Sequence, residues 1–432
     1  MLHRLKDALY FRVARYFGLF AGIRLHRWKP RVVVVTGSNG KTTALHMIEA
    51  QLGSVARYSH HRNSAFGIAF DILGLGDAAD SRWNWILLGL LAPIYAWRTP
   101  PPEKIYVAEA DCDRPGEGRF LSSLLSPEIV VWLNSARTHS EKFAQTAKEA
   151  GENIDESIAY EFGFFLERAS TLVILNGDDE HIIRQSKRTR ARIEEITEAR
   201  DLGGYAVSKS GTVFDVGGKK YSFPYLLPQD VFRAIVASQI VATYFDAAPS
   251  RDLSSFAPPP GRSSLFKGMH GTTIIDSSYN INAGSLAAIL GMVKHIEGEK
   301  WFVLGDMTEQ GVYEQEEHER VARMVSSESF ARVILVGPRM RAFALPILLE
   351  SGKKVESFDE PKDALVYLQS AQRGGEIILF KGARFLEGII EHLLADPRDA
   401  EKLCRREARW QARRRKWGLP ALLEVSKLET RS

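Results

Sequence analysis

Short runs of apolar residues, separated by amphipathic stretches, recur along the first half of the chain. Four valines at residues 32–35 form the first run, and others follow at residues 105–110, 128–134, 171–176 and 204–207. Runs of this length that are rich in β-branched residues are typical of strands buried on both faces of a sheet. Because helical patterns lie between them, we expect an α/β fold with a mostly parallel sheet covered by helices.

A second alternating series occupies the chain from residue 271 onward. It follows a proline-rich stretch, SSFAPPPGR, which is typical of a domain boundary. We therefore predict a smaller, Rossmann-like α/β domain, with strands at residues 272–278, 300–306, 332–337 and 376–382. The expected divisions are an N-terminal segment (1–30), a central domain (31–253), the linker (254–262), a C-terminal domain (263–396) and a helical tail (397–432).

The sequence after the four valines, TGSNGKTT, has the composition of a phosphate-binding loop. Gly37 and Gly40 allow backbone N–H groups to turn toward an anion, and the following helix adds its free N–H groups and positive dipole end. Lys41 can reach nucleotide phosphates, and the Thr42 hydroxyl can hold Mg²⁺. The turn is expected at the surface, so that replacing Lys41 should cost little core packing. The candidate phosphate-binding residues are Gly37, Ser38, Asn39, Gly40, Lys41, Thr42 and Thr43.

Composition places the chain among soluble proteins of two or three domains. Hydrophobic residues make up 45% of the chain and charged residues 25%, as in ordinary globular proteins. The two cysteines, Cys112 and Cys404, cannot form a disulfide framework, and no Cys/His cluster has zinc-ligand spacing. A cytoplasmic location is therefore expected.

The net charge of +4 is distributed unevenly. Residues 1–30 carry seven lysines and arginines and one acid, Asp7, so this segment has a net charge of +6 and the remainder −2. Aromatic and aliphatic residues lie among these charges. Two interpretations stay open: the segment is a helix that makes peripheral contact with the inner face of the membrane, or it packs on the central domain with a solvated basic face.

Two further segments have compositions that suggest special roles. The run WILLGLLAPIYAW at residues 85–97 is too short to span a bilayer, so we expect a buried helix that ends at Pro93, with shallow membrane contact as the alternative. The basic tail is expected to be a solvated helix with Trp410 and Trp417 packed inward, and no nucleic-acid partner is expected.

A phosphate loop that uses Mg²⁺ needs further ligands to complete the metal shell. Glu109 lies at the end of the expected strand at residues 105–110, at the edge of the sheet where ligands of such folds bind. Asn134 and His139 follow the next expected strand. These side chains are candidates to lie beside the loop.

The motifs resemble those of the Mur ligases, the ATP-dependent amide-forming enzymes of peptidoglycan synthesis. TGSNGKTT is close to the TGTNGKTT loop of that family, EADCDRPGE is similar to its E-x-G-x-x-x-x-G-E, and LNSARTH matches its N-I-x-x-x-H segment. In the second series, IIDSSYNINAGSL, FVLGDMTEQG and FKGAR resemble D-D-S-Y-N-A-N-x-x-S, V-L-G-D-M-x-E-L-G and V-K-G-S-R of the branch that adds D-Ala-D-Ala. The resemblance covers roughly residues 31–395.

The resemblance implies an ATP-dependent carboxylate–amine ligase that acts through an acyl phosphate, with ATP and Mg²⁺ as cofactors. Its acyl substrate would be a muramyl-peptide-like small molecule, and its amine substrate an amino acid or dipeptide. Lys41, Glu109 and His139 would be catalytic, and Thr42 would join Glu109 and His139 as Mg²⁺ ligands. Matching positions imply further roles, with Arg262, Asp276 and Asn280 toward the nucleotide and Asp306, Glu309, Lys381 and Arg384 toward the substrate.

The chain departs from that family in places. Only 30 residues precede the first expected strand, too few for an independent UDP-binding domain. The family's carbamylated lysine falls on Phe162, with Lys148 as a possible substitute, its adenine-contacting asparagine on Arg233, and the second acid of its D-D-S-Y-N run on Ser277. Two alternatives stay open: an amide ligase of the same superfamily that acts on a lipid-linked or non-UDP substrate, and a nucleotide-binding scaffold without catalysis.

Overall fold

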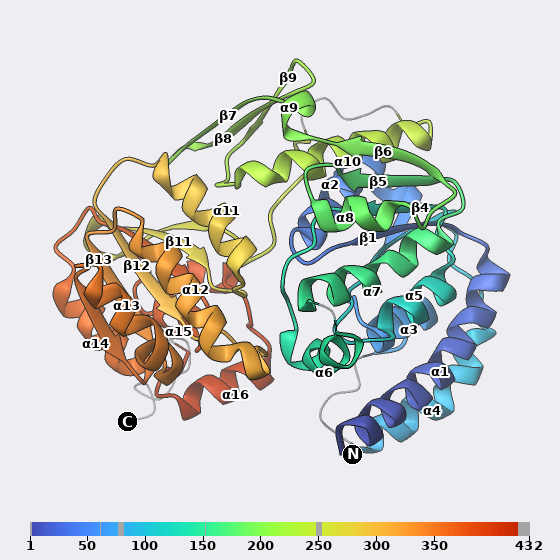
Figure 1. The fold of residues 1–432 in the computed structure, drawn as a ribbon, viewed down its shortest axis with the longest axis horizontal. Helices are drawn as coiled ribbons and strands as arrows, with labels where there is room; N and C mark the ends of the chain where they lie inside the picture. The colour runs from blue at the N-terminus through green and yellow to red at the C-terminus, as the bar shows by residue number, and fades with distance from the viewer. Residues whose placement is uncertain (1, 61, 77–81, 152, 248–252, 422–432) are drawn as a thin grey trace. The chain divides into compact units, whose positions relative to one another are not determined.

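The computed structural model of the protein describes residues 2–60, 62–76, 82–151, 153–247 and 253–421. The chain divides into two compact units, and Figure 1 shows the elements of each. Unit 1 comprises Met1–Gly203 and Val231–Phe256, and unit 2 comprises Gly204–Asp230 and Ala257–Ser432. Each unit contains a six-stranded sheet, which confirms the predicted α/β class.

The sheet of unit 1 has the order β2-β3-β1-β4-β5-β6, and every neighbouring pair runs parallel. Because β1 lies between β3 and β4, the carboxyl ends of these three strands meet at one edge of the sheet. The valines of β1 are buried, as expected for a central strand of a parallel sheet. The strands are β1 (Arg31–Thr36), β2 (Ala56–Tyr58), β3 (Ile105–Glu109), β4 (Ile129–Trp132), β5 (Leu172–Asn176) and β6 (Arg192–Ile196).

Helices cover the sheet of unit 1, with α2 packed against α10 and α5 packed against α7 (Figure 1). The basic N-terminal segment forms one long helix, α1, which contacts α3, α4 and α5. Its buried side chains include Ala14, Phe17 and Ala21, so one side of α1 is part of the core. The helices are α1 (Leu2–Trp28), α2 (Lys41–Leu52), α3 (Ala65–Leu73), α4 (Arg82–Ala96), α5 (Glu117–Leu125), α6 (Ser140–Ala150), α7 (Ile154–Arg168), α8 (Glu180–Ser186), α9 (Glu198–Asp201) and α10 (Phe232–Tyr244).

The apolar run at residues 85–97 differs from its prediction. It lies in α4, where Pro93 is inside the helix and does not end it, and much of the helix surface is exposed. Leu88, Ala92 and Ala96 are buried, whereas Leu90 is 68% exposed. The prediction of a buried helix is wrong. The apolar residues of α4 occur all round the helix, and such a composition does not show whether other elements cover both of its sides.

Unit 2 contains a sheet of order β10-β11-β15-β12-β13-β14. All its pairs are parallel except β10 with β11, which is antiparallel. Hydrophobic clusters line both faces of this sheet. Its strands are β10 (Ser264–Lys267), β11 (Thr273–Ser277), β12 (Lys300–Gly305), β13 (Arg332–Val336), β14 (Val355–Phe358) and β15 (Ile377–Lys381), and its helices are α11 (Ala283–Lys294), α12 (Glu314–Ser326), α13 (Leu345–Glu350), α14 (Pro361–Ala371), α15 (Leu386–Glu391) and α16 (Ala408–Lys416).

A separate three-stranded sheet is formed by β7 (Leu202–Ser208), β8 (Gly211–Val216) and β9 (Lys219–Phe223). Its contacts group residues 204–230 with unit 2, whereas the boundary drawn from the sequence assigned them to the central domain. Val207 and Leu226 belong to the same hydrophobic cluster as Ile275 of β11, which explains this grouping.

The basic tail forms α16, which is fixed by buried contacts. Trp410 and Trp417 both pack against the ring of Phe385, and the fully buried Arg414 donates to Glu391 at 2.7 Å. Residues 422–432 lie outside the described residues. None of the helices in the described part of the chain has the length and apolar character needed to cross a lipid bilayer.

Candidate active site

The phosphate-binding sequence connects β1 to α2 through a tight turn. Gly37 has φ of 123°, and a Cβ there would lie 2.8 Å from the carbonyl oxygen of Asn134, so a larger residue would clash with backbone. Gly40 has φ of 78° and is the N-cap of α2. The first residues of α2, Lys41, Thr42 and Thr43, are buried. The turn therefore directs the N-terminus of α2 to the edge of the sheet where β1, β3 and β4 end.

Asn134, which follows β4, fixes the middle of the loop. Its side-chain Oδ1 accepts from the Asn39 amide at 2.8 Å, and its Nδ2 donates to the Asn39 carbonyl at 2.9 Å. Its own carbonyl accepts from Ser38 N at 3.2 Å. Ser38 Oγ also donates to Ala136 O at 2.7 Å. Hydrogen bonds from the segment that follows β4 thus hold the loop in shape.

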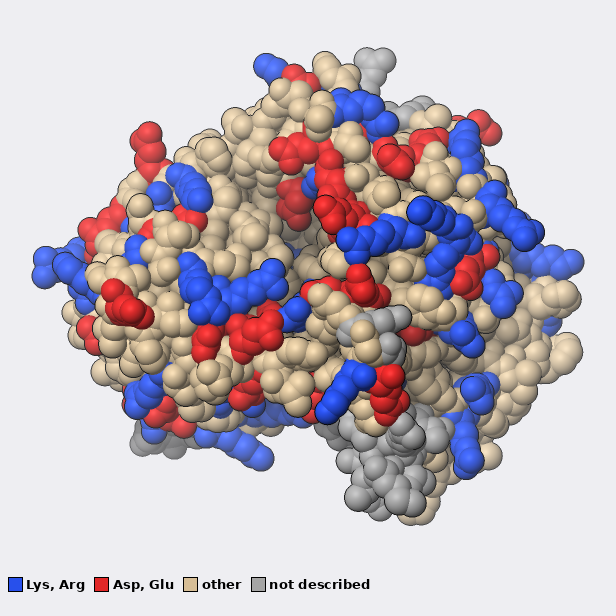
Figure 2. All heavy atoms as spheres, in the orientation of Figure 1, with Lys and Arg blue, Asp and Glu red and all other residues tan. Residues whose placement is uncertain are grey.

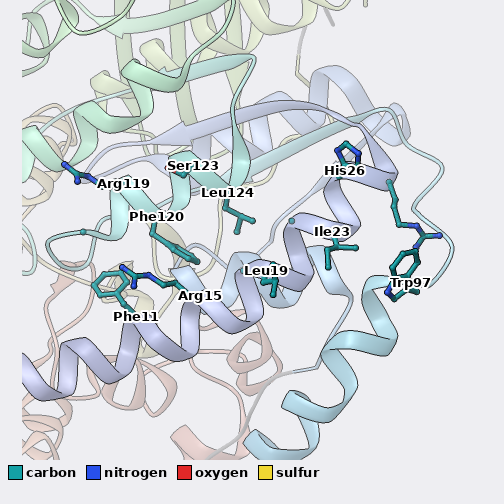
Figure 3. A pocket seen from close by; sticks show the side chains of 14 residues that line it. Phe11, Arg15, Leu19, Ile23, His26, Trp97, Arg119, Phe120, Ser123 and Leu124 are labelled. Carbon is teal, nitrogen blue, oxygen red and sulfur yellow. The ribbon is translucent and has the colours of Figure 1, made fainter.

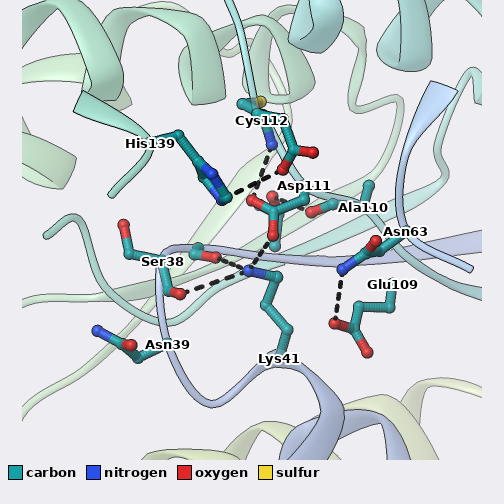
Figure 4. Close-up of polar contacts among 12 residues, drawn as sticks. Ser38, Asn39, Lys41, Asn63, Glu109, Ala110, Asp111, Cys112 and His139 are labelled. Atoms are coloured by element: carbon teal, nitrogen blue, oxygen red, sulfur yellow. Dashed lines mark hydrogen bonds and ion pairs between the residues drawn. The ribbon is translucent and has the colours of Figure 1, made fainter. Parts of the chain in front are cut away.

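Lys41 lies folded back into the loop (Figure 4). Its Nζ donates to the Gly37 carbonyl at 2.6 Å and forms an ion pair with Asp111 Oδ2 at 2.7 Å. Burial alone would lower the pKa of Lys41, but the charges of Asp111 and Glu109 outweigh it and raise this pKa. The lysine is therefore a fully charged ammonium group, and its prediction as a surface side chain is wrong because only 6% of it is exposed.

Three side chains beside Lys41 form a compact acid–histidine group. The ligand atoms of Asp111, Asp113 and His139 lie within 4.8 Å of one another. His139 Nε2 is 3.2 Å from Asp113 Oδ1. Burial would raise the pKa of Asp111, but Lys41 and then His139 lower it below the usual value. Carboxylate oxygens with one imidazole nitrogen are a suitable donor set for a divalent cation.

Glu109, at the end of β3, lies close to this group and is 5% exposed. Asn63 Nδ2 donates to its Oε1 at 3.4 Å, and its backbone amide donates to Ser59 Oγ at 2.8 Å. Glu109 contributes to the raised pKa of Lys41. The structure therefore brings together three predicted residues, Lys41, Glu109 and His139.

Asp111 and Asp113, which lie in the loop after β3, were not predicted from the sequence. Their signal was the spacing of acids in EADCDRPGE, which places a carboxylate at every second position after the strand end. The last acid of that run, Glu117, has a structural role. It accepts from Ala65 N at 2.8 Å, Asp113 N at 3.1 Å and Tyr10 Oη at 2.7 Å, and burial raises its pKa to about 7.

The two positions considered for a carbamylated lysine have different surroundings. Phe162 is fully buried on α7 and its ring packs against Trp132 at a centroid distance of 5.8 Å. Lys148 is an exposed residue of α6. Phe162 is therefore a core residue.

Arg233, at the start of α10, binds the turn after β5. Its Nε donates to Asn176 Oδ1 at 3.0 Å, and its guanidinium also pairs with Asp178. Asp179 in the same turn accepts from Ser135 N at 2.7 Å. The NGDDE turn thus links α10 to the loop that carries His139.

In unit 2, the residues that were predicted to contact the nucleotide lie at the carboxyl end of β11 and beside it. Lys381 Nζ donates to the Asn280 carbonyl at 3.0 Å and to Ser277 Oγ at 3.4 Å. Burial raises the pKa of Asp276, whose Oδ1 accepts from Ser278 N at 2.9 Å. Arg262 stacks on the ring of Tyr279 at 5.0 Å from its centroid. These contacts place Arg262, Asp276, Asn280 and Lys381 in one polar cluster.

Burial lowers the pKa of Lys381 to about 7, and the nearby charge of Arg262 adds to this lowering while Asp276 opposes it. Between about pH 7 and about pH 10 the unfolded chain therefore binds a proton that the folded chain lacks, so this lysine makes the unfolding free energy rise with pH.

We expect Lys381→Met to remove that rise. Urea unfolding at about pH 7 and about pH 10 should show the wild type gaining stability relative to the variant as the pH increases. Lys362→Met, at an exposed position of unit 2, is the matched control and should leave the pH profile unchanged. If the unfolding free energies of the wild type and of Lys381→Met change in parallel with pH, the lowered pKa of Lys381 is contradicted.

A second cluster of unit 2 surrounds Asp306, which follows β12 and is fully buried. Its Oδ1 accepts from Met340 N at 2.9 Å, and its Oδ2 accepts from Arg384 Nε at 2.9 Å. A Cβ at Gly337, whose φ is 120°, would lie 2.3 Å from this carboxyl group, so glycine is required there. Glu309 is exposed in the loop that follows. Asp306 and Arg384 are thus brought together, with the carboxylate orienting the guanidinium.

Two family models match most of the chain. The Mur ligase middle domain matches residues 35–227, and the Mur ligase glutamate ligase domain matches residues 261–384. The chain belongs to the Mur ligase family. Members of this family are ATP-dependent ligases that form amide bonds.

Similar curated proteins are UDP-N-acetylmuramoyl-tripeptide--D-alanyl-D-alanine ligases. That of Bacillus subtilis (strain 168) is 29% identical over 380 residues, covering 85% of this chain and 76% of the relative. That of Escherichia coli (strain K12) is 26% identical over 341 residues, covering 76% of this chain and 69% of the relative.

Solved structures share the fold of this Mur ligase. MurF from Acinetobacter baumannii aligns with a TM-score of 0.70 at 18% identity, covering 88% of this chain and 80% of that one. MurF from Thermotoga maritima in complex with ADP aligns with a TM-score of 0.70 at 19% identity, covering 90% and 84%. This likeness confirms the fold predicted from the sequence.

Proposed function

We propose that this Mur ligase joins a carboxylate of a muramyl-peptide-like acyl substrate to the amine of D-Ala-D-Ala or a single amino acid, with conversion of ATP to ADP and phosphate. The observation that carries the proposal is the arrangement in unit 1, where a preshaped phosphate loop, a buried lysine and an acid–histidine group meet at one sheet edge. The D-Ala-D-Ala ligases named above support the choice of amine.

The phosphate loop would bind the nucleotide with groups that are already oriented. The N-terminus of α2 offers free N–H groups and a positive dipole end, and the Asn39–Asn134 hydrogen bonds hold the loop open in that shape. Lys41 would exchange its contact with Asp111 for phosphate oxygens. Its charge would then stabilise the negative charge on the transferring phosphoryl group.

The expected reaction has two steps. The substrate carboxylate attacks the γ-phosphorus of ATP, the bond to the β-phosphate oxygen breaks, and ADP leaves with formation of an acyl phosphate. The amine then attacks the acyl carbon, inorganic phosphate leaves, and the amine loses a proton, which gives the amide. Exclusion of water from the acyl phosphate is needed because water competes with the amine.

A divalent cation fits the acid–histidine group on its donor chemistry, with Asp111, Asp113 and His139 as the residues that would hold it. Glu109, at the end of β3, and Thr42, at the start of α2, are further candidates. Mg²⁺ would supply neutralisation of phosphate charge when it is bound. Asp113 is counted among the residues that would hold the cation because it contacts His139.

In unit 2 we assign Arg384 to the carboxylate end of the amine substrate. A guanidinium is suited to bind a carboxylate with two hydrogen bonds, and Asp306 fixes its orientation. Asp306 is fully buried, so it is a positioning residue for Arg384. Glu309 and Lys381 remain candidates for the amine substrate, and Arg262, Asp276 and Asn280 for the nucleotide.

The test is ADP release from purified protein given ATP and Mg²⁺ with defined substrate pairs. UDP-linked muramyl tripeptide and a lipid-linked muramyl peptide are each combined with D-Ala-D-Ala, with D-Ala or with buffer. ADP release that requires both an acyl and an amine substrate, with an amide product by mass spectrometry, would support the proposal. If none of the substrate pairs causes ADP release while the protein still binds ATP, the protein is a nucleotide-binding scaffold instead.

The acid–histidine group can be tested through its Mg²⁺ requirement. We expect Asp113→Asn and Glu109→Gln to raise the Mg²⁺ concentration for half-maximal activity by about tenfold or more, because each change removes a negative charge beside the cation. Glu141→Gln, at an exposed position in the first turn of α6, is the control. An unchanged Mg²⁺ profile would exclude the replaced carboxylate from the metal site.

A further inference from the structure

One face of α4 presents large apolar side chains to solvent. The exposed members recur every three or four residues, which is the spacing of one helix face. Their exposed fractions are 79% for Trp83, 54% for Leu87, 68% for Leu90, 61% for Ile94 and 67% for Trp97. A contiguous exposed apolar stripe of this kind marks an interaction site in a soluble protein.

The apolar surface continues from α4 onto α1. Tyr16, Trp85 and Ile86 line an open groove of about 470 Å³ between the two helices. On the other side of α1, Leu19 and Trp97 line a larger open groove of about 900 Å³ that also includes Phe120 and Leu124 of α5 (Figure 3). The stripe, the two grooves and the outer side of α1 therefore form a single surface, which we call the α1–α4 face.

Basic side chains surround the α1–α4 face, and acids are rare in its helices. The sequence from residue 8 to residue 28 and the whole of α4 contain no Asp or Glu. In Figure 2 the described atoms at the lower right of the molecule, where these helices run, include several blue side chains among tan ones. The exposed basic residues on or beside the face are Arg12, Arg15, Arg27, Lys29, Arg98 and Arg119.

The face has a fixed shape because α1 anchors α4 by hydrogen bonds. The buried Arg24 donates from Nη1 to the Tyr95 carbonyl at 2.5 Å and from Nη2 to the Thr99 carbonyl at 3.2 Å. Arg27 Nη1 donates to the Ala96 carbonyl at 2.9 Å. These guanidinium groups satisfy the free carbonyls at the C-terminus of α4, where positive charge is favoured. The apolar stripe therefore belongs to an ordered part of unit 1.

We infer that the α1–α4 face docks on the surface of an anionic lipid bilayer. Helices that lie in the plane of a membrane interface share three features with this face. They have apolar side chains on one side, tryptophans near their ends and basic residues around the apolar side. The excess of basic residues over acids in α1 and α4 favours anionic lipid over a protein partner or a second copy of this chain, whose surfaces carry both signs of charge. This inference does not rest on the ligase reaction.

Vesicle co-sedimentation with the full chain tests the inference. Vesicles of phosphatidylcholine with about 30% phosphatidylglycerol are compared with vesicles of phosphatidylcholine alone, at low and high salt. We expect the anionic vesicles to bind most of the protein at low salt, and the neutral vesicles to bind at least about tenfold less. Binding should weaken with salt, since the basic residues contribute through screened charges.

Two sets of substitutions distinguish binding through the apolar stripe from nonspecific binding through any exposed apolar side chain. The triple variant Leu87→Gln, Leu90→Gln and Ile94→Gln should lower binding to anionic vesicles at least about tenfold, with an unchanged melting temperature because all three positions are exposed. The matched control is Leu349→Gln with Val366→Gln, which changes exposed apolar residues of unit 2 and should bind as the wild type does.

Three experimental results would overturn the inference. It is wrong if the wild type fails to bind anionic vesicles at low salt, or if the triple variant binds as well as the wild type. It is also wrong if light scattering after gel filtration shows a dimer that the triple variant disperses while vesicles bind neither protein. In that case the α1–α4 face is an interface between copies of this chain.

Discussion

Replacing Lys41 by methionine is expected to lower ADP formation by about 10³-fold or more. The ammonium group is the only side-chain cation that the described structure places inside the phosphate loop, and loss of a charge that stabilises the transferring phosphoryl group has effects of this size. Steady-state ADP release with a productive substrate pair measures the effect. Activity within tenfold of the wild type would contradict the assignment of the loop.

The same substitution is expected to destabilise the fold. Lys41 and Asp111 have side chains that are 7% and 10% exposed, so removal of the lysine leaves a buried carboxylate without its ion-pair partner. Such a change typically costs about 3–5 kcal/mol of unfolding free energy. The double variant Lys41→Met with Asp111→Asn should recover most of this stability and remain inactive. Recovery of activity in the double variant would show that Lys41 acts only through the fold.

Replacing Arg384 by glutamine is expected to lower kcat/KM for the amine substrate by about 100-fold, with little change in the KM for ATP. The guanidinium is oriented by the fully buried Asp306, and loss of a buried charge-assisted contact to a carboxylate has this magnitude. Initial rates with varied D-Ala-D-Ala and saturating ATP give the measurement.

Two further variants make the role of Arg384 specific. Asp306→Asn keeps the size of the side chain and weakens the anchor, so an intermediate loss of about tenfold in the same parameter is expected. Arg398→Gln, which removes an exposed arginine of unit 2, should behave as the wild type does. A normal KM for the amine in Arg384→Gln would rule out the proposed contact.

The sequence predicted those parts of the site that depend on local pattern. Four valines, two glycines and a lysine in order are enough to predict a strand, a tight turn and a helix N-terminus, because each step depends on residues close in the sequence. The partner of Lys41 was not predicted. Asp111 reaches it because β3 pairs with β1 in the sheet, and strand order follows from packing that a single sequence does not display.

The surface of the protein was less predictable than its core. The apolar run in α4 has the same composition as a buried helix, and only the arrangement of α1 and α3 around it shows which side has no cover. Similarly, the strands of residues 204–230 follow the pattern of a sheet but pack with the hydrophobic cluster of unit 2. Both cases depend on contacts between segments distant in the sequence.

The ion pair between Lys41 and Asp111 has a consequence for the choice among cellular anions. The positive charge of Lys41 is paired with an internal carboxylate, Asp111, which also accepts from the Cys112 amide at 2.9 Å. An anion that binds Lys41 would have to displace that carboxylate, so we expect inorganic phosphate, which can form few contacts, to compete poorly. A triphosphate chain can use the lysine and several backbone N–H groups of the loop together. We therefore expect the loop to bind ATP much more tightly than inorganic phosphate, and competition between the two anions for the protein would measure this preference.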